Sequence, residues 1–235
     1  MNRKIYIFIA VVALTLASPA SSPRAMKLDP TGLEITPLPS TAQVITASTQ
    51  VDLDGDGLPE RIIVTLSEQA AILSGANLRW QSPKGWQVRQ ALIADLNQDG
   101  LPEVVLLVWR PFKPWPVDKW LPNGGRINRF HNQDGLSCHL ILIGWYQNTF
   151  RERWAGSALA EPIQIFAATD LSASGKQFLV TLVGSYDTPI GAPATQLKVW
   201  EWNGFGFTVI SKVDGRFTQL AIIRDDNRQA LILAP

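Results

Sequence analysis

The chain has 235 residues, a formal net charge of +1 at pH 7 and a hydrophobic content of 46%. The near-neutral charge offers no basic field to a phosphate backbone, so we expect no nucleic-acid partner. Cys138 is the single cysteine, which excludes an internal disulfide bond.

The first 25 residues have the layout of a secretory signal peptide. Arg3 and Lys4 precede an apolar run of 13 residues, Ile5 to Ala17, and mostly small residues follow up to Ala25. A bilayer span needs about 20 apolar residues. An uncleaved N-terminal anchor is the alternative. We therefore expect a secreted, periplasmic or extracellular protein without a stable membrane span after signal removal, and one domain over residues 26–235.

An acidic turn, residues 52–59, follows the first predicted strand of a repeating pattern, residues 43–51. Counted from Asp52, acidic residues occupy positions 1, 3 and 5 of this turn and position 9 just after it, and Gly57 stands at position 6, where a calcium loop bends sharply. The next residues, 61–66, are an apolar and β-branched run that is too short for a helix. The turn therefore joins two strands. Its candidate calcium ligands are Asp52, Asp54, Asp56, Glu60 and the carbonyl of Leu58.

A second acidic turn, residues 95–102, begins 43 residues after the first and also precedes an apolar run. A period of about 40–45 residues is the length of a propeller blade. A solvated turn without an ion is the alternative for both, but converging carboxylates repel each other unless a cation neutralises them. We expect up to two structural Ca²⁺ ions. The candidate ligands of the second are Asp95, Asn97, Asp99, Glu103 and the carbonyl of Leu101.

Two weaker copies of the pattern begin at Asp170 and Asp225. Serines replace two acidic residues in the third copy, and the fourth is a short turn without glycine, so we expect both to be free of metal. The four units predict an all-β fold, a small β-propeller with four blades. The fourth unit lacks its outer strands, and residues 28–40 are expected to supply them and close the ring. An open stack of blades is the alternative.

The second unit contains an insertion, residues 110–137, rich in proline, glycine and tryptophan. It lies between the second and third strands, as does a shorter loop, residues 184–195, in the third unit. Both are expected on the face opposite the acidic turns. A stiff loop with aromatic and basic side chains suits a carbohydrate or protein ligand, although a tryptophan lid over the propeller is the alternative. The candidate ligand-binding residues are Arg110, Phe112, Trp115, Trp120, Arg126 and Tyr186.

The acidic turns, the strands after them and the hairpin at residues 200–207 resemble the FG-GAP or VCBS-type repeats of integrin α-chain propellers and many exported bacterial proteins. The resemblance covers roughly residues 44–233. It implies structural calcium in the Asp-rich turns, held by the ten positions named above, and ligand binding on the other face. The chain departs from the repeats in its final Glu, in its third and fourth turns, and in its insertion.

No catalytic residues are indicated. His131 and His139 are the only histidines, and Cys138 and His139 point to opposite faces of a predicted strand, so they form no nucleophile and base pair. No cluster of His and Cys predicts a catalytic zinc. We expect a binding or surface-interaction module that is not an enzyme. The alternatives are a small propeller hydrolase or lyase acting on polysaccharide, and a structural part of an envelope assembly.

Overall fold

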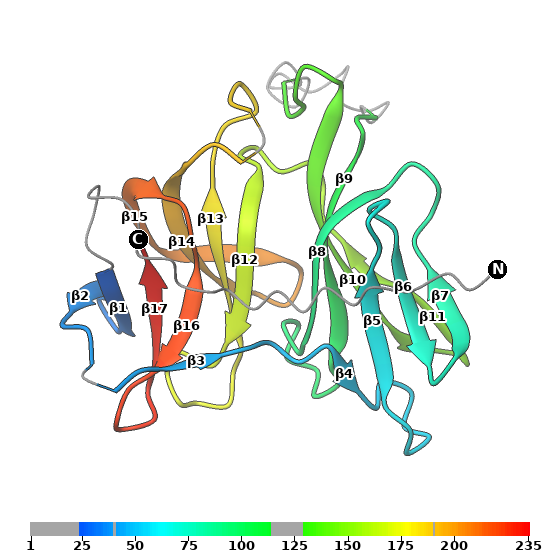
Figure 1. Cartoon of the computed structure of the whole chain (residues 1–235), viewed down its shortest axis with the longest axis horizontal. Coiled ribbons are helices and arrows are strands. Elements are labelled where there is room, and N and C mark those ends of the chain that lie inside the picture. The colour runs from blue at the N-terminus through cyan, green and yellow to red at the C-terminus, as the bar shows by residue number, and fades with distance from the viewer. Residues whose placement is uncertain (1–23, 40, 114–128, 190) are drawn as a thin grey trace.

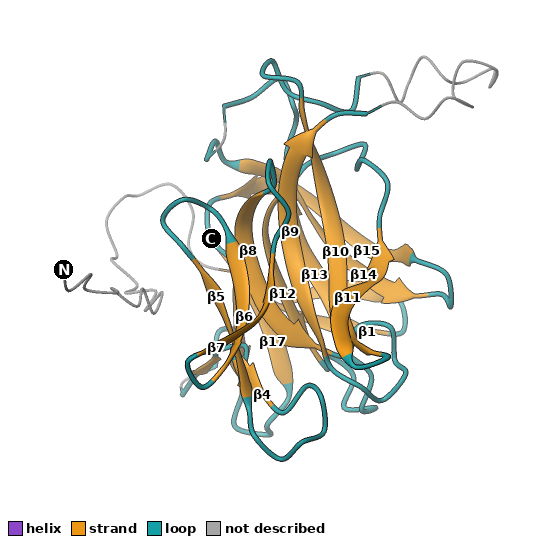
Figure 2. Cartoon of the chain, turned by 90° about the vertical axis from the view of Figure 1, so that its right-hand side faces the viewer, coloured by secondary structure: helices purple, strands orange, loops and turns teal. Residues whose placement is uncertain are grey.

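The computed structural model describes residues 24–39, 41–113, 129–189 and 191–235. Every regular element in these residues is a β-strand, and the strands form four antiparallel sheets arranged as a four-bladed β-propeller, as predicted (Figure 1). Figure 2 shows the same strands from the side, with loops at both ends of the sheets. Among the described residues, no helix has the length and apolarity that crossing a membrane requires.

The first three blades each consist of four consecutive strands, ordered from the centre outward. Blade one contains β4 (Gln50–Val51), β5 (Glu60–Val64), β6 (Ala70–Ser74) and β7 (Asn77–Gln81). Blade two contains β8 (Gln87–Ala94), β9 (Glu103–Pro111), β10 (Leu136–Tyr146) and β11 (Thr149–Ala155). Blade three contains β12 (Ile163–Thr169), β13 (Phe178–Val183), β14 (Ala194–Trp202) and β15 (Phe207–Phe217).

Blade four is completed by the N-terminal strands, as predicted, but together these strands span residues 24–36 and not the expected residues 28–40. Its inner strands β16 (Ala221–Arg224) and β17 (Ala230–Ala234) are followed outward by β1 (Arg24–Asp29) and β2 (Gly32–Thr36). Ala25 and Met26 in β1 are each 1% exposed. Arg24 and Ala25, which precede the predicted domain start at residue 26, thus belong to β1.

The single strand predicted over residues 43–51 is divided in two, which corrects the prediction. β3 (Gln43–Ile45) pairs with β16 of blade four, whereas β4 pairs with β5 of blade one. Between them, the Ser48 hydroxyl donates to the carbonyl of Gln50 and accepts its N–H, and this local turn interrupts the strand. The segment thus carries the chain from the last blade to the first.

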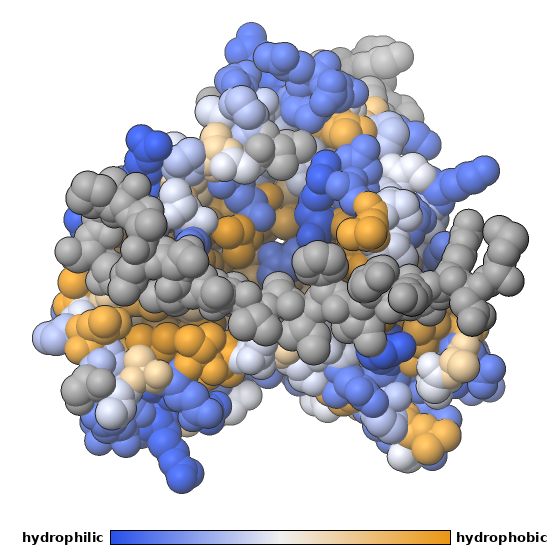
Figure 3. Space-filling view, in the orientation of Figure 1, coloured by the Kyte–Doolittle hydropathy of each residue, from blue (hydrophilic) through white to orange (hydrophobic). Residues whose placement is uncertain are grey.

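Three hydrophobic clusters fill the interfaces between consecutive blades one to four. Alternation along β9 shows how: Val104 and Leu106 pack toward blade one, and Val105 and Leu107 toward blade three. The fourth cluster draws all its residues from blade four, so among the described residues no cluster joins blade four to blade one. Figure 3 shows apolar surface on blade four near β3, where Val44 is exposed.

The acidic turns and the long connections of the blades lie at opposite ends of the molecule. The β4–β5 and β8–β9 turns are at the lower end of Figure 1, and the β9–β10 and β13–β14 connections are at the upper end, as predicted. Arg110 and Ser137 pair with each other in strands β9 and β10, so the insertion is shorter than predicted and covers residues 112–135. Residues 114–128 lie outside the described part of the chain.

Candidate metal centre

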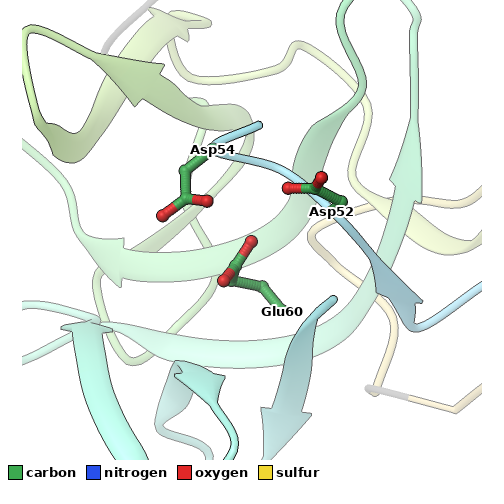
Figure 4. Close-up of side chains that lie close together, drawn as sticks. All are labelled: Asp52, Asp54 and Glu60. Carbon is green, nitrogen blue, oxygen red and sulfur yellow. The ribbon is translucent and has the colours of Figure 1, made fainter. Parts of the chain in front are cut away.

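The carboxylates of Asp52, Asp54 and Glu60 converge in the first acidic turn (Figure 4). One oxygen of each lies within 4.8 Å of the others, and this is the one such group of three among the described residues. Glu60 opens β5 and is 0% exposed. Its Oε2 accepts the N–H of Leu53 at 2.9 Å, but its Oε1 accepts no hydrogen bond from a described residue.

The backbone of the turn explains how these side chains are held. The N–H groups of Gly55 and Gly57 donate to the two oxygens of Asp52 at 2.8 and 2.9 Å. Gly57 has φ of 88°, a left-handed conformation that glycine adopts without steric cost. These hydrogen bonds therefore bend the chain around the Asp52 carboxylate, while Glu60 is positioned as the first residue of strand β5.

Two of the five predicted ligands in this turn are not part of the converging group. Asp56 Oδ1 accepts the N–H of Leu58 at 2.8 Å, which orients that carboxylate along the turn. The Leu58 side chain is exposed at the tip. Asp56 and the Leu58 carbonyl thus remain predicted ligands, and the structure brings together Asp52, Asp54 and Glu60.

The second acidic turn also contains buried carboxylate oxygens without a donor. Glu103 opens β9 and is 2% exposed. Glu103 Oε2 and Asp95 Oδ1 are both buried and accept no hydrogen bond from a described residue. Burial, followed by the charges of Asp99 and Asp95, raises the pKa of Glu103 to about 8. Near neutral pH and without an ion, Glu103 therefore carries a proton.

Asn97 and Leu101 complete the second set of candidates. The Asn97 amide nitrogen donates to Glu103 and, at 3.2 Å, to Asp99, so a neutral donor occupies the space between the carboxylates. A cation there would require the amide to present its oxygen instead. Leu101 is exposed at the tip, and its N–H donates to Asp99 at 3.0 Å. The second turn thus brings its predicted ligands near one another. The carboxylates of Asp95, Asp99 and Glu103 converge less closely than those of the first turn.

In the third turn, the same conformation is held by hydrogen bonds between backbone N–H groups and one aspartate side chain. Asp170 accepts the N–H groups of Ser172, Ser174 and Gly175 at 3.0, 3.2 and 2.6 Å. In the fourth turn, Asp225 accepts two backbone N–H groups, from Asn227 and Gln229. One aspartate is enough to shape these turns, and the prediction that they bind no metal stays a prediction.

The donor sets of the first two turns fit a calcium ion. They offer carboxylate and carbonyl oxygens, which Ca²⁺ prefers, in irregular loops that suit its flexible coordination better than the strict octahedron of Mg²⁺. The buried oxygens of Glu60, Asp95 and Glu103 that accept no hydrogen bond from any described residue are the atoms that an ion would satisfy. A bound Ca²⁺ would supply positive charge to the turns.

At the opposite end, two predicted ligand-binding residues are packed onto neighbours. The Arg110 guanidinium lies 5.6 Å from the ring centroid of Trp86, and burial lowers its pKa. The ring of Phe112 lies 5.3 Å from that of His131 and is partly exposed. The remaining candidates of the insertion, Trp115, Trp120 and Arg126, lie outside the described residues.

Tyr186, the last of the predicted ligand-binding residues, is buried in the described structure. Its hydroxyl accepts the N–H of Cys138 at 3.1 Å and donates to the carbonyl of Leu159 at 2.8 Å. Its ring meets Trp109 edge to face at a centroid distance of 5.7 Å. Tyr186 therefore joins blades two and three and presents no free polar group to a ligand.

Sequence reasoning missed a hydrogen-bonded pair, Ser137 and His139, on β10. The Ser137 Oγ and His139 Nε2 atoms lie 2.8 Å apart, and His139 Nδ1 lies 3.0 Å from the carbonyl of Gly156. Burial lowers the pKa of His139 to about 4, so the ring is neutral near neutral pH. The two residues are 0% and 6% exposed. Their spacing of two on a strand, which places both on one face, was the available clue.

Comparison with known proteins assigns the chain to no family. No protein-family model matches the chain, and no curated protein matches it. The resemblance to FG-GAP or VCBS repeats therefore rests on the two acidic turns and their spacing.

Proposed function

We propose that this chain is an exported, calcium-stabilised β-propeller that acts as a binding or surface-interaction module. The observation that supports the calcium site best is Glu60. Its Oε1 is buried and accepts no hydrogen bond from a described residue, and one of its carboxylate oxygens lies within 4.8 Å of those of Asp52 and Asp54. Leaving a buried acceptor unsatisfied costs about 1–3 kcal/mol. A cation between these carboxylates removes that cost and their mutual repulsion.

The ion has a structural role in this proposal. Glu60 and Glu103 are the first residues of β5 and β9, and the aspartates lie on the turns that lead into these strands. A Ca²⁺ ion bound by both parts fastens the turn to its strand, at the inner edge of the blade. The second site depends in the same way on Asp95 and Glu103.

The ligand, a protein or a carbohydrate, engages the opposite end, where the insertion lies. Phe112 is partly exposed at the base of the insertion, and Arg110 stacks over Trp86 beside it. Aromatic and arginine side chains are the residues that most often anchor such contacts. The stabilising ions and the ligand are thus kept at separate ends of the propeller.

A binding role agrees with the described polar groups better than catalysis. Ser137 and His139 have the residue types of a nucleophile and a base, but Ser137 is fully buried. The Ser137 hydroxyl oxygen also lies 3.4 Å from the carbonyl oxygen of Arg110. A substrate would have to displace these strand contacts to reach the hydroxyl.

Thermal unfolding with calcium and with a chelator tests the calcium part of the proposal. We expect calcium to raise the melting temperature, because a ligand that binds the folded state stabilises it. Asp54→Asn and Asp99→Asn should each reduce this rise. Asp170→Asn is the matched control, because it removes a turn aspartate that is held by backbone N–H groups. It should lower the melting temperature equally with and without calcium.

Melting temperatures that ignore calcium in the unsubstituted protein would overturn the proposed ion sites. A loss of the calcium response in Asp170→Asn as large as that in Asp54→Asn would show that the substitutions act on turn folding and not on ion binding.

The ligand end is tested by retention on immobilised polysaccharides and by crosslinking to surface proteins of the source cells. Phe112→Ala should lose most of the retention or crosslinking. Phe205→Ala is its control, since Phe205 is 88% exposed on the hairpin between β14 and β15. Equal binding by both variants would exclude the insertion end as the ligand site.

A further inference from the structure

An arginine from the outer strand of blade one reaches the first acidic turn. Arg79, in β7, donates from Nη2 to Asp54 Oδ2 at 2.7 Å. The Asp54 side chain is 3% exposed and that of Arg79 is 28% exposed. The pair is therefore largely shielded from water, where a charge interaction is stronger than on an open surface. Asp54 is one of the three converging carboxylates of the candidate metal centre.

The same guanidinium also contacts blade two. Its carbon lies 5.1 Å from the ring centroid of Trp145 and 5.9 Å from that of Phe150. These two rings pack against each other at a centroid distance of 4.8 Å. A cation at this distance from aromatic rings is attracted to them. Arg79 is thus held between an acidic turn of blade one and an aromatic pair of blade two.

We propose that Arg79 is a tethered cation that competes with calcium for Asp54, an inference that rests on the proposed calcium site. Without the ion, the guanidinium neutralises one of three carboxylates that would otherwise repel each other. A Ca²⁺ ion bound to Asp54 places a second positive centre close to the guanidinium, and the two cations repel. Calcium binding therefore weakens the Arg79–Asp54 pair and shifts Arg79 against Trp145.

Two properties follow from this competition. The first turn keeps its shape when calcium is scarce, because Arg79 supplies part of the missing charge, and its affinity for calcium is lower than its carboxylates alone would give. Occupancy of the turn is also communicated to the interface between blades one and two, through the ring of Trp145.

The second turn provides an internal comparison. Arg153, in β11, approaches Asp99 at 3.9 Å and lies over the ring of Tyr146 at 4.6 Å. The ion pair is longer and Asp99 is more exposed than Asp54. The donor between the second set of carboxylates is instead the neutral amide of Asn97. Among the described residues, an arginine therefore reaches the carboxylates at hydrogen-bond distance in the first turn, whereas Arg153 stays at 3.9 Å in the second.

The test compares two proteins, the Asp99→Asn variant and the same variant with Arg79→Gln added. Each is titrated with calcium chloride, and the titration is measured by calorimetry and by tryptophan fluorescence. The Asp99→Asn background isolates the first site. Removing Arg79 should tighten calcium binding by about tenfold, the effect of losing one nearby like charge. It should also lower the melting temperature in chelator and abolish the fluorescence change. Arg89→Gln, which removes an arginine paired with Glu68, should leave all three readouts unchanged.

Two further variants secure the interpretation. Trp145→Phe should lose the fluorescence change while keeping the calcium affinity, which assigns the signal to that ring. If Arg79→Gln does not fold, Arg79→Lys keeps the charge but loses the planar stacking. It should still show weak calcium binding and a reduced fluorescence change.

Each contrary result is distinct. Weaker or unchanged calcium binding in Arg79→Gln, with the parent Asp99→Asn protein binding normally, would overturn the competition and leave the calcium site intact. If Arg79→Lys binds calcium about tenfold more tightly than its parent, charge competition is likewise refuted. Absence of calcium binding at the first site in both the parent and the unsubstituted protein would overturn the proposed site and this inference together.

Discussion

The side-chain amide of Gln90 forms two hydrogen bonds with the backbone of Phe166, one in each direction. Its Nε2 donates to the Phe166 carbonyl at 2.6 Å, and its Oε1 accepts the Phe166 N–H at 3.0 Å. Gln90 belongs to β8 and Phe166 to β12, the inner strands of blades two and three. One side chain thus links two blades at a point where both strands are irregular in register.

Gln90→Leu should lower the free energy of unfolding by about 2–4 kcal/mol, because it leaves the two backbone groups of Phe166 without their partner. Urea denaturation measures the change. Gln81→Leu, on the exposed side of β7, should change it by less than about 0.5 kcal/mol. Equal effects of the two substitutions would show that the link between the blades adds no stability.

Met26→Ala tests the closure of blade four by the N-terminal strand. Met26 is 1% exposed within the cluster between blades three and four. Its truncation should cost about 2–5 kcal/mol of unfolding free energy. Ile35→Ala in the adjacent strand is the control, since Ile35 is 64% exposed, and it should cost far less. A small effect of Met26→Ala would mean that β1 is not part of the stable core.

His139 predicts a loss of stability in acid. Its pKa is lowered from 6.5 to about 4 by burial, so the unfolded chain binds its proton first as the pH falls. The contribution of the neutral ring is fully present above pH 6.5 and is lost as the pH falls through about 4. His139→Gln lacks this titration. The difference in unfolding free energy between the two proteins should therefore shrink across that interval, and a constant difference would contradict the assignment.

Glu103 predicts that calcium binding at the second turn depends on pH. Its pKa of about 8 exceeds the ordinary value of 4.5, so without an ion its stabilising proton is lost as the pH rises through about 8. A calcium ion must displace that proton. In Asp54→Asn protein, calcium binding should tighten by up to about tenfold per pH unit below this pKa and release up to about one proton per ion. Calorimetry in buffers of different ionisation enthalpy measures both, and binding without proton release would refute the prediction.

The fold was largely predictable because its signals are local. Two acidic turns 43 residues apart, each followed by a β-branched run, define the blade length, and weaker turns at Asp170 and Asp225 complete the count. The missing strands of the last unit pointed to the N-terminus. The division of residues 43–51 was not predictable in this way, because it depends on pairing with β16 and on a turn centred on Ser48.

The site was predictable in part, for the same physical reason. Asp52, Asp54 and Glu60 lie close in sequence, so the turn itself brings them together. Arg79 lies 25 residues from Asp54 in the sequence and meets it only when the outer strand β7 of blade one folds beside the turn. The burial of Tyr186 was not predictable either, because its hydroxyl bonds to Cys138 and Leu159, which lie far from it in the sequence.

The number of calcium ions bound at equilibrium tests the central claim most directly. Calorimetric titration of the chain from residue 24 onward, freed of metal beforehand, should show two ions per protein. Asp54→Asn should remove the ion of the first turn, and Asp99→Asn that of the second. A protein that binds no calcium would contradict the account, since the buried oxygens of Glu60 and Glu103 would then be satisfied in some other way.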